Sequence, residues 1–425
     1  MQRNNTIVAF ILLIWFVISF VSNIIGPLMP SLIETYELNL TLAAFLPFSF
    51  FLAYAIVSIP SGLMIELIGS KKAMLIAFSL NLTGVLLFAL FPVYLIALLS
   101  LFIVGIGMAM LQVIINPLMR STGGEENFAF FSVMGQLVFG LASFVSPLVF
   151  GYLMVTLPEA TSDNASLFVQ LLNFVTPQDK HWLALYWLFS VVFIALISLV
   201  ARINIPNIKL KSNEKSGGWG VCKELLKNRS VVLYFIGIVA YVGTEQGLAN
   251  FMSEFLRQYH GISPEKEGAV IVSWFWGLMS IGCLLGLALL KLMDSTRVLK
   301  LFSLNALICV ACALYGPTDV ALIAFPLTGL LISVLFSIIF SLGLNSVREH
   351  HGSFSGILCT GIFGGALVPL LIGILGDWLG LRAGMGVLFV TIGYIFSIGF
   401  WAKPLITNKT LFSTKVSTEI SGNAS

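Results

Sequence analysis

The sequence predicts an all-α polytopic membrane protein whose twelve transmembrane helices form two pseudo-symmetric six-helix bundles. The first observation behind this prediction is composition, because 58% of the 425 residues are hydrophobic and only 10% are charged. The second is a set of long apolar runs, and the third is a weak internal repeat. Soluble domains carry about 25% charged residues, so the composition excludes that class of protein. The first apolar run is longer than the core of a signal peptide, so we expect no cleaved signal.

Twelve apolar runs have the length and composition needed to cross a bilayer. Their connections are mostly short, and the two longer ones follow the fifth and sixth runs. The predicted spans are 7–32, 42–66, 73–93, 95–118, 128–153, 182–201, 231–256, 267–290, 298–315, 319–343, 354–376 and 384–402.

The distribution of Lys and Arg predicts the orientation of these spans. With both termini in the cytoplasm, 18 of the 22 basic residues lie on the cytoplasmic side, and the others are Lys180, Arg257, Lys266 and Arg382. We therefore expect a multi-pass protein of the cytoplasmic (inner) membrane with both termini cytoplasmic. The net charge of +3 follows from this asymmetry, so it does not indicate a nucleic-acid partner.

A basic segment that contains Pro206, Gly217 and Gly218, residues 202–230, divides the chain into two halves. The predicted organisation is an N-terminal bundle at 1–201, this cytoplasmic linker, a C-terminal bundle at 231–403 and a cytoplasmic tail at 404–425.

The two halves share a weak repeat at an offset of 222 residues. The string SPLVFGYL at 146–153 matches VPLLIGIL at 368–375, which aligns Gly151 with Gly373. The same offset aligns Ser58 with Ser280 and Gly107 with Gly329. A pseudo-two-fold axis along the membrane normal would relate the halves.

The stretch YVGTEQGLANF, residues 241–251, is the most informative of the chain. Its Glu245 is the only acidic residue that we place deep within an apolar run. A carboxylate at that depth costs about 2.5–3.5 kcal/mol on insertion scales, and such groups are usually functional. We expect Glu245 to face a central cavity and to couple transport to a cation. The alternative is a protonated Glu245 that holds two helices together by a hydrogen bond.

Polar and aromatic neighbours of Glu245 are candidate substrate ligands. Tyr241, Gln246 and Asn250 lie in the same stretch, and the repeat aligns Glu245 with Asn23 of the first span. Asn23 would then face the same cavity, and Thr244 or Asn23 could share a bound sodium ion with Glu245.

The fourth span contains two amides on one helical face, Gln112 and Asn116, beside Pro117, which is expected to bend the helix. Amides donate and accept hydrogen bonds, as sugar hydroxyls require. Gln136 in the fifth span is a similar candidate. The alternative for all three is an amide hydrogen bond between helices.

Two further groups have a functional and a structural interpretation. Trp274 and Trp276 cannot face the same way, and either ring could stack on a sugar; the alternative is lipid contact. Glu66, Lys71 and Lys72 end the second span and could form a gate between the bundles. The alternative for the lysines is anchoring by the positive-inside rule.

We find no constellation for catalysis, a cofactor or a metal. None of the four histidines lies deep in an apolar run, and the glycines of GIFGG at 361–365 read as helix-packing residues. Four of the five cysteines lie in apolar runs, and Cys309 and Cys312 read as packing residues, so no disulfide is expected.

These stretches resemble the major facilitator superfamily, and within it the fucose permease and glucose/galactose transporter group. The resemblance covers nearly the whole chain and rests on 58–72, 105–118, 241–251 and 355–377. It implies two six-helix bundles around a central site that opens alternately to each side. It also implies monosaccharide substrates, carried with a proton or sodium.

The sequence departs from that group at three positions. Gly26 stands where fucose-permease-like members have an acid, Gln112 replaces another acid, and Cys283 stands where the group usually has an Arg. A proton site in the first helix is therefore excluded, so Glu245 takes that role or transport is uncoupled.

We expect a monomeric secondary transporter that moves a small polar solute, most simply a monosaccharide, by symport with a proton or sodium. The alternatives are an exporter of a larger or amphiphilic solute, an uncoupled facilitator and a transporter-like receptor. Because the central loop and the tail are short, the sequence argues against a receptor. An embedded enzyme would need a nucleophile–base or metal set that we do not find.

Overall fold

The computed structural model describes residues 5–123, 128–159, 166–203, 205, 219–347 and 351–403. All regular elements within these ranges are helical. Twelve of the helical segments are long and apolar enough to cross a membrane, which confirms the predicted number of spans.

The first six spans belong to the N half. Their helices are α1 (Asn5–Ser22), α2 (Ile25–Tyr36), α3 (Leu40–Ile68), α4 (Ser70–Leu90), α5 (Tyr94–Gly123), α6 (Phe128–Glu159), α7 (Leu167–Val175), η2 (His181–Leu183) and α8 (Ala184–Arg202). The short α9 (Trp219–Leu225) lies within the predicted linker.

The last six spans form the C half. Their helices are α10 (Arg229–His260), η3 (Pro264–Gly268), α11 (Ala269–Leu292), α12 (Ser295–Tyr315), α13 (Thr318–Ile332), α14 (Leu335–Leu344), α15 (His351–Thr360), η4 (Gly361–Phe363), α16 (Gly364–Leu379), α17 (Leu381–Met385) and α18 (Val387–Trp401).

Several spans that the sequence predicts as single helices are interrupted, including the twelfth, which breaks at Gly386 between α17 and α18. The first breaks at Asn23–Ile24, between α1 and α2. Pro27 explains this break, because it lacks the N–H that would bond to the carbonyl of Asn23 one turn earlier. The tenth span breaks between α13 and α14, and the eleventh passes through the 3₁₀ turn η4 at the glycines of GIFGG.

Each half has its own hydrophobic core. One core is built from buried side chains between Ile7 and Ile205, and the other from those between Val231 and Ile398. A few residues cross over: Leu40 and Ala44 of α3 belong to the core of the C half. Ala269 and Ala366 belong likewise to the core of the N half. The halves are therefore two packed units that also contact each other.

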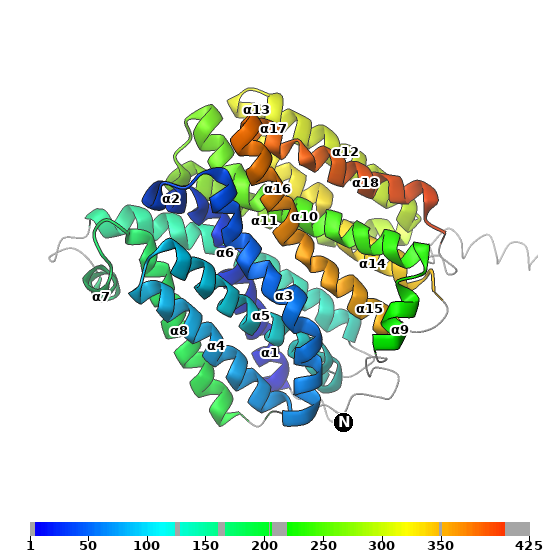
Figure 1. Ribbon diagram of the computed structural model, residues 1–425, viewed down its shortest axis with the longest axis horizontal. Coiled ribbons are helices and arrows are strands. Elements are labelled where there is room, and N and C mark those ends of the chain that lie inside the picture. Colours follow the sequence, from blue (N-terminus) through cyan, green and yellow to red (C-terminus); the bar gives the residue numbers. More distant parts are fainter. Residues whose placement is uncertain are drawn as a thin grey trace, which may run out of the picture.

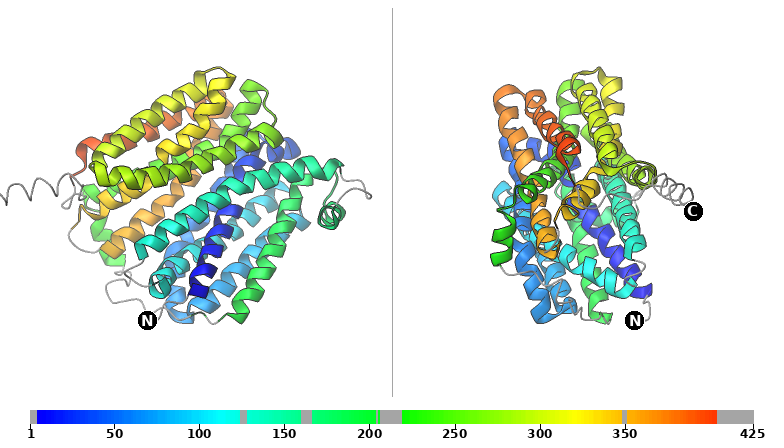
Figure 2. Two further views of the ribbon diagram at one scale, coloured as in Figure 1. Left: turned by 180° about the vertical axis from the view of Figure 1, so that it is seen from behind. Right: turned by 90° about the vertical axis from the view of Figure 1, so that its right-hand side faces the viewer.

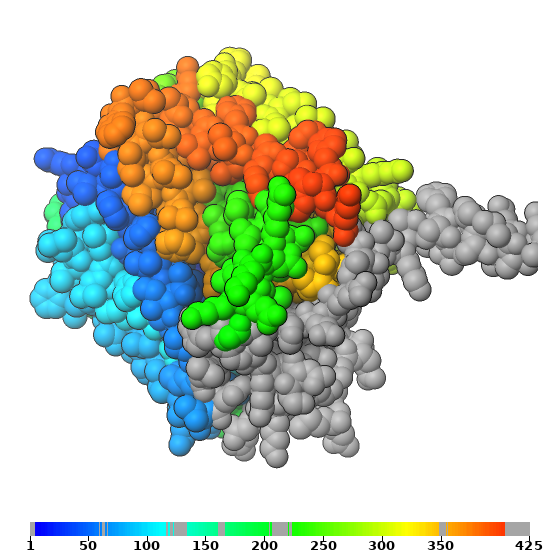
Figure 3. Space-filling view, turned by 45° about the vertical axis from the view of Figure 1, so that its right-hand side comes forward, coloured from blue at the N-terminus to red at the C-terminus, as the bar shows by residue number. Residues whose placement is uncertain are grey.

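Two helix pairs form the most extensive contacts between the halves, which we call the seams, and α10 also contacts α2. Helix α3 packs against α16, and α6 packs against α11. Figure 1 shows the first pair, Figure 2 shows the second from behind, and Figure 3 shows α3 beside α15 and α16 at the surface.

The glycines of the sequence repeat allow the same close contact in both seams. A Cβ at Gly151 would lie 2.6 Å from the carbonyl oxygen of Glu265, where α11 is entered. A Cβ at Gly373 would lie 2.5 Å from the carbonyl oxygen of Leu40, where α3 begins. Only glycine permits such backbone approach, so the weak repeat corresponds to equivalent contacts in the fold.

These contacts lie towards one end of the molecule. We call the end that holds Asn5, Arg202 and Arg229 the linker side, and the other end the opposite side. In Figure 1 the N-terminus marks the linker side, and α2, α13 and α17 lie towards the opposite side. The backbones of the two halves meet closely at the opposite side, where α3 and α11 begin.

Candidate functional site

The Glu245 carboxylate lies half-buried in the middle of α10 and accepts hydrogen bonds from two neighbours. The Tyr241 hydroxyl, one turn earlier, donates to Oε2 at 2.9 Å, and the Gln246 side-chain amide donates to Oε1 at 3.2 Å. Both donors are neutral, and among the described residues no Lys or Arg forms an ion pair with Glu245. The carboxylate therefore has polar support without a permanent countercharge.

The contacts that Glu245 and its neighbours Tyr241 and Thr244 make lie within the C half. The ring of Tyr241 contacts Phe336 of α14, with 5.6 Å between centroids. Thr244 points elsewhere, because its hydroxyl pairs with that of Thr391 on α18 at 2.7 Å. The structure therefore places Tyr241 and Gln246 at Glu245, as expected, and directs Thr244 to a helix contact.

Asn23 lies at the break between α1 and α2, and its amide binds within the N half. Its Nδ2 donates to the hydroxyls of Ser143 at 2.9 Å and Ser19 at 3.3 Å. Ser19 and Ser143 are themselves 2.6 Å apart. This network ties α1 to α6, so the amide nitrogen that the repeat placed opposite Glu245 is used for helix packing here.

Among the residues of α10 and α11 that are fully buried, four side-chain polar atoms have no hydrogen-bond partner. They are Nδ2 of Asn250, Nε1 of Trp276 and the hydroxyl oxygens of Ser253 and Ser273. Asn250 is 3% exposed and Trp276 is 1% exposed, so bulk water does not satisfy them. Buried polar groups are rarely unpaired, so these atoms are unusual.

Asn250 lies where α10 crosses α2 of the other half. A Cβ at Gly26 would lie 2.1 Å from the carbonyl oxygen of Ala249 and 3.4 Å from the Cα of Asn250. No larger side chain fits at position 26 in this arrangement. A glycine at position 26 is therefore a requirement of the crossing.

The two tryptophans of α11 face in different directions, as expected. Trp276 is buried and meets Phe275 edge-on, with 5.3 Å between ring centroids. Trp274, about 200° away around the helix, is 47% exposed and meets Phe144 of α6 edge-on at 5.6 Å. Trp274 thus packs across the α6–α11 seam, and its part in a binding site stays a prediction.

The predicted amide face of the fourth span stays a prediction. Gln112 is half-buried on α5, but the side chain of Asn116 lies outside the described residues. Gln136 is exposed on α6. Its contribution to a binding site is likewise untested.

The predicted gate residues are on the linker side. Lys71 Nζ donates to the carbonyl oxygen of Ala201 at 2.9 Å, near the C-terminus of α8. A cation is favourable at a helix C-terminus, and this contact stays within the N half. Lys72 is exposed, and the side chain of Glu66 lies outside the described residues. The observed contact of Lys71 favours anchoring over a latch between halves.

Two acidic residues that the sequence analysis did not single out make specific contacts. Glu254 of α10 is fully buried, and both of its oxygens accept from Arg257, at 2.7 and 2.8 Å. Gln258 donates to the same carboxylate at 2.6 Å. Arg257 and Gln258 follow Glu254 by three and four residues, and this helical spacing could have predicted both contacts from the sequence. The second acid, Asp377, joins the two halves and is treated below.

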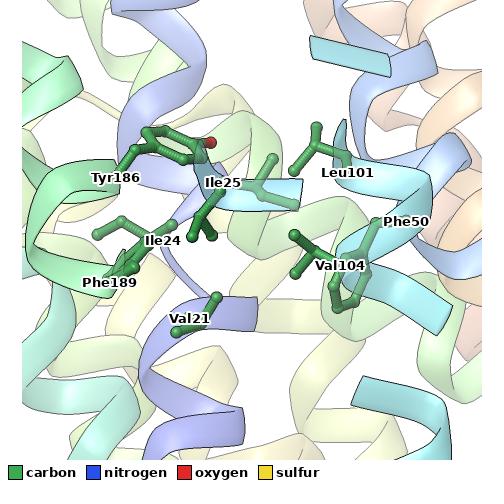
Figure 4. A pocket seen from close by; sticks show the side chains of 9 residues that line it. Val21, Ile24, Ile25, Phe50, Leu101, Val104, Tyr186 and Phe189 are labelled. Atoms are coloured by element: carbon green, nitrogen blue, oxygen red, sulfur yellow. The ribbon is translucent and has the colours of Figure 1, made fainter. Parts of the chain in front are cut away.

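An apolar pocket lies beside the break between α1 and α2 (Figure 4). Val21, Ile24 and Ile25 line it together with side chains of α3, α4, α5 and α8. Its walls offer almost no hydrogen-bonding groups, so it does not suit a polar solute. Within the described residues, no group of three or more His, Cys, Asp or Glu side chains could hold a metal ion.

Comparison with known proteins identifies the family. A model described as Major Facilitator Superfamily matches residues 11–361. The chain belongs to the Major Facilitator Superfamily. It is 29% identical over 397 residues to a glucose/galactose transporter of Brucella abortus (strain 2308), covering 91% of this chain and 92% of the relative. It is 22% identical over 398 residues to the L-fucose-proton symporter of Escherichia coli (strain K12), covering 88% of each.

Solved structures share the fold. The E. coli fucose:proton symporter FucP, in the outward conformation, superposes with a TM-score of 0.65 at 20% identity, covering 93% of this chain and 98% of that one. A bacterial homologue of the human lysosomal transporter Spinster, inward-facing and unoccupied, gives a TM-score of 0.76 at 15% identity, covering 94% and 96%. The resemblance and the fold class predicted from the sequence are thereby confirmed.

Proposed function

We propose that this superfamily member is a secondary transporter that carries a monosaccharide across the cytoplasmic membrane by symport with a cation. Both termini lie in the cytoplasm, as the distribution of basic residues predicts. The names of the relatives support a sugar as substrate, because they are glucose/galactose transporters and L-fucose-proton symporters.

The observation that carries the proposal is the setting of Glu245. It is a carboxylate in the middle of a membrane-spanning helix, held by Tyr241 and Gln246 and without a basic partner among the described residues. Such a group is costly in a bilayer and is retained where it serves an ion, a proton or a substrate. Glu254, on the same helix, forms an ion pair with Arg257, so its carboxylate already has a cationic partner.

The sugar would bind beside this carboxylate. Asn250 and Trp276 supply unpaired donors, and Gln246 adds an amide next to Glu245. An amide both donates and accepts, as a sugar hydroxyl requires, and an indole face stacks on the apolar face of the sugar ring. Few polar groups in an otherwise apolar lining is the usual composition of a small-molecule site.

Coupling follows from the two charge states of Glu245. A proton or sodium ion on the carboxylate neutralises it, which favours passage through a closed, water-poor intermediate. Opening to water on the other side stabilises the charged form and releases the cation. Tyr241 and Gln246 then donate to the free carboxylate, as they do in this structure. Solute and cation thus cross together while the halves rock about their seams.

The test is uptake of radiolabelled sugars into proteoliposomes that contain the purified protein, under imposed proton or sodium gradients. Wild type should accumulate at least one monosaccharide against its gradient. Glu245→Gln mimics the neutral carboxylate, so it should still exchange that sugar but fail to accumulate it. Glu267→Gln removes an exposed carboxylate next to α11 and should behave as wild type.

The other outcomes separate the alternatives. Accumulation by Glu245→Gln would contradict the coupling role and leave the interpretation as a helix contact. Wild-type exchange without accumulation under either gradient would indicate a facilitator. Binding of a sugar without any exchange would indicate a receptor. If the protein binds none of the tested sugars, an exporter of another solute would be favoured.

A further inference from the structure

The carboxylate of Asp377 bridges the two halves at the opposite side. Asp377 lies in the last turn of α16, in the C half. Its Oδ1 accepts from the backbone N–H of Leu40 at 2.8 Å, and its Oδ2 accepts from that of Thr41 at 2.8 Å. Both donors belong to the first turn of α3, in the N half. One side chain of one half therefore uses both of its oxygens on the helix terminus of the other.

The first turn of α3 depends on this contact for half of its hydrogen bonds. The first four N–H groups of a helix, counted from its N-cap residue, have no backbone partner within it, and those of Leu40, Thr41 and Leu42 are among them. The side chain of Asn39 accepts from Leu42, and the carbonyl of Asn39 accepts from Ala43. Asp377 accepts from Leu40 and Thr41, so the N–H groups of residues 40–43 are all paired, two of them by the other half. A carboxylate is also the preferred charge at this positive end of the helix dipole.

The contact exists only while the halves are close at this side. Gly373 lies one turn before Asp377, and its Cα leaves just enough room for the carbonyl of Leu40. The side chain of Leu40 is 8% exposed and belongs to the core of the C half. If α3 and α16 separate here, Leu40 leaves that core, and the N–H groups of Leu40 and Thr41 lose the carboxylate together.

We propose that Asp377 is a conformational latch that stabilises the state closed at the opposite side by capping α3 of the other half. The inference rests on the proposed function, because a latch has meaning only in a protein whose halves move. It differs in location from Glu66, Lys71 and Lys72, which end α3 and begin α4 on the linker side. The seam between α6 and α11 has the matching glycine, Gly151. The residue that the repeat aligns with Asp377 is Val155, which has no carboxylate. Only one of the two pseudo-symmetric seams therefore has the carboxylate.

The test measures the halves directly, without a solute. Spin labels are placed at Asp179 in the N half and Lys266 in the C half, two exposed positions at the opposite side, after replacement of the five native cysteines. Their distance distribution, measured by pulsed electron paramagnetic resonance, reports closed and open populations. Asp377→Asn keeps one acceptor and should lower the closed-to-open ratio by about three- to tenfold, and Asp377→Ala should lower it further.

Control variants isolate the capping interaction. Asp319→Asn removes an exposed carboxylate from the first turn of α13, on the same side but within one half, and should leave the distribution unchanged. Leu40→Pro removes the donor to Oδ1 at a helix position that tolerates proline, because Asn39 before it is extended. It should open the seam more than Leu40→Ala, which removes only side-chain packing, and this excess should vanish in an Asp377→Ala background.

The outcomes judge the latch separately from the transport proposal. An unchanged distance distribution in Asp377→Asn, Asp377→Ala and Leu40→Pro would overturn the latch, whatever sugar the protein carries. A graded shift towards the open population, with Asp319→Asn unchanged, would support it even if no tested sugar is transported. If Asp377→Ala fails to fold, Leu40→Pro and Leu40→Ala are compared instead. A larger open population in Leu40→Pro would support the latch, and equal populations would contradict it.

Discussion

At the scale of single residues, the chemistry of side chains could be predicted but their partners could not. The sequence identified Glu245 from its cost in a bilayer, and the structure gives it Tyr241 and Gln246 as donors. The repeat placed Asn23 in the same cavity, whereas its amide binds Ser19 and Ser143. Which of two helical neighbours an amide meets depends on helix rotation, and the apolar pattern of an almost wholly hydrophobic helix determines that rotation only weakly.

Gly26 gives a prediction at this scale. A Cβ at this position would meet the carbonyl of Ala249 at 2.1 Å, and backbone atoms cannot yield as a flexible side chain would. Gly26→Ala should therefore destabilise the present arrangement by about 1–3 kcal/mol, the usual range for overpacking. Gly393→Ala in α18 is the matched control, because a Cβ there meets nothing within 4 Å. Thermal unfolding in detergent should show a lower midpoint for Gly26→Ala only, and equal midpoints would contradict the close crossing.

At the scale of elements, the twelve spans followed from apolar length, and the interruptions did not. The break after Asn23 was readable from Pro27, because the missing N–H can be counted in the sequence. The break at Ser333 has no proline within one turn, and the hydroxyl of Ser333 bonds to the carbonyl of Leu330. Such bonds within a turn compete with the helix only when packing allows, so their effect depends on tertiary structure.

The link between α1 and α6 gives the prediction for this scale. Ser143→Ala removes the acceptor of the Asn23 amide and the partner of Ser19. Hydrogen bonds between membrane helices average about 0.6 kcal/mol and reach about 1.7 kcal/mol, so stability should fall within that range. The control is Ser198→Ala in α8, whose hydroxyl bonds only to its own helix. Reversible unfolding of both variants measures the difference.

The same variant separates the two interpretations of Asn23. If Asn23 only packs helices, Ser143→Ala should leave sugar affinity unchanged despite its lower stability. A several-fold loss of sugar affinity with unchanged stability would instead indicate that Asn23 belongs to the binding site.

At the scale of the whole molecule, the architecture could be predicted from the sequence more completely than any single site. The repeat at 222 residues came from glycines and prolines, and the structure shows why these survive in both halves. Gly151 and Gly373 each admit a backbone carbonyl at the seam, a requirement that other residues cannot meet. The latch at Asp377 was not predictable in this way, because the carboxylate acts on backbone groups more than 330 residues away.

Orientation is the last property of the whole molecule, and it rests on charge alone. Among exposed residues, Asp179 lies in the connection before α8 on the opposite side, and Lys227 lies before α10 on the linker side. If the linker side is cytoplasmic, an impermeant thiol reagent added to intact cells should label Asp179→Cys and spare Lys227→Cys. Permeabilised cells should show labelling at both positions, which controls for reactivity. The cysteine-free parent should remain unlabelled throughout. Labelling of Lys227→Cys in intact cells, with Asp179→Cys protected, would mean that the bias of 18 to 4 basic residues does not decide the topology, and the closed seam would then face the cytoplasm.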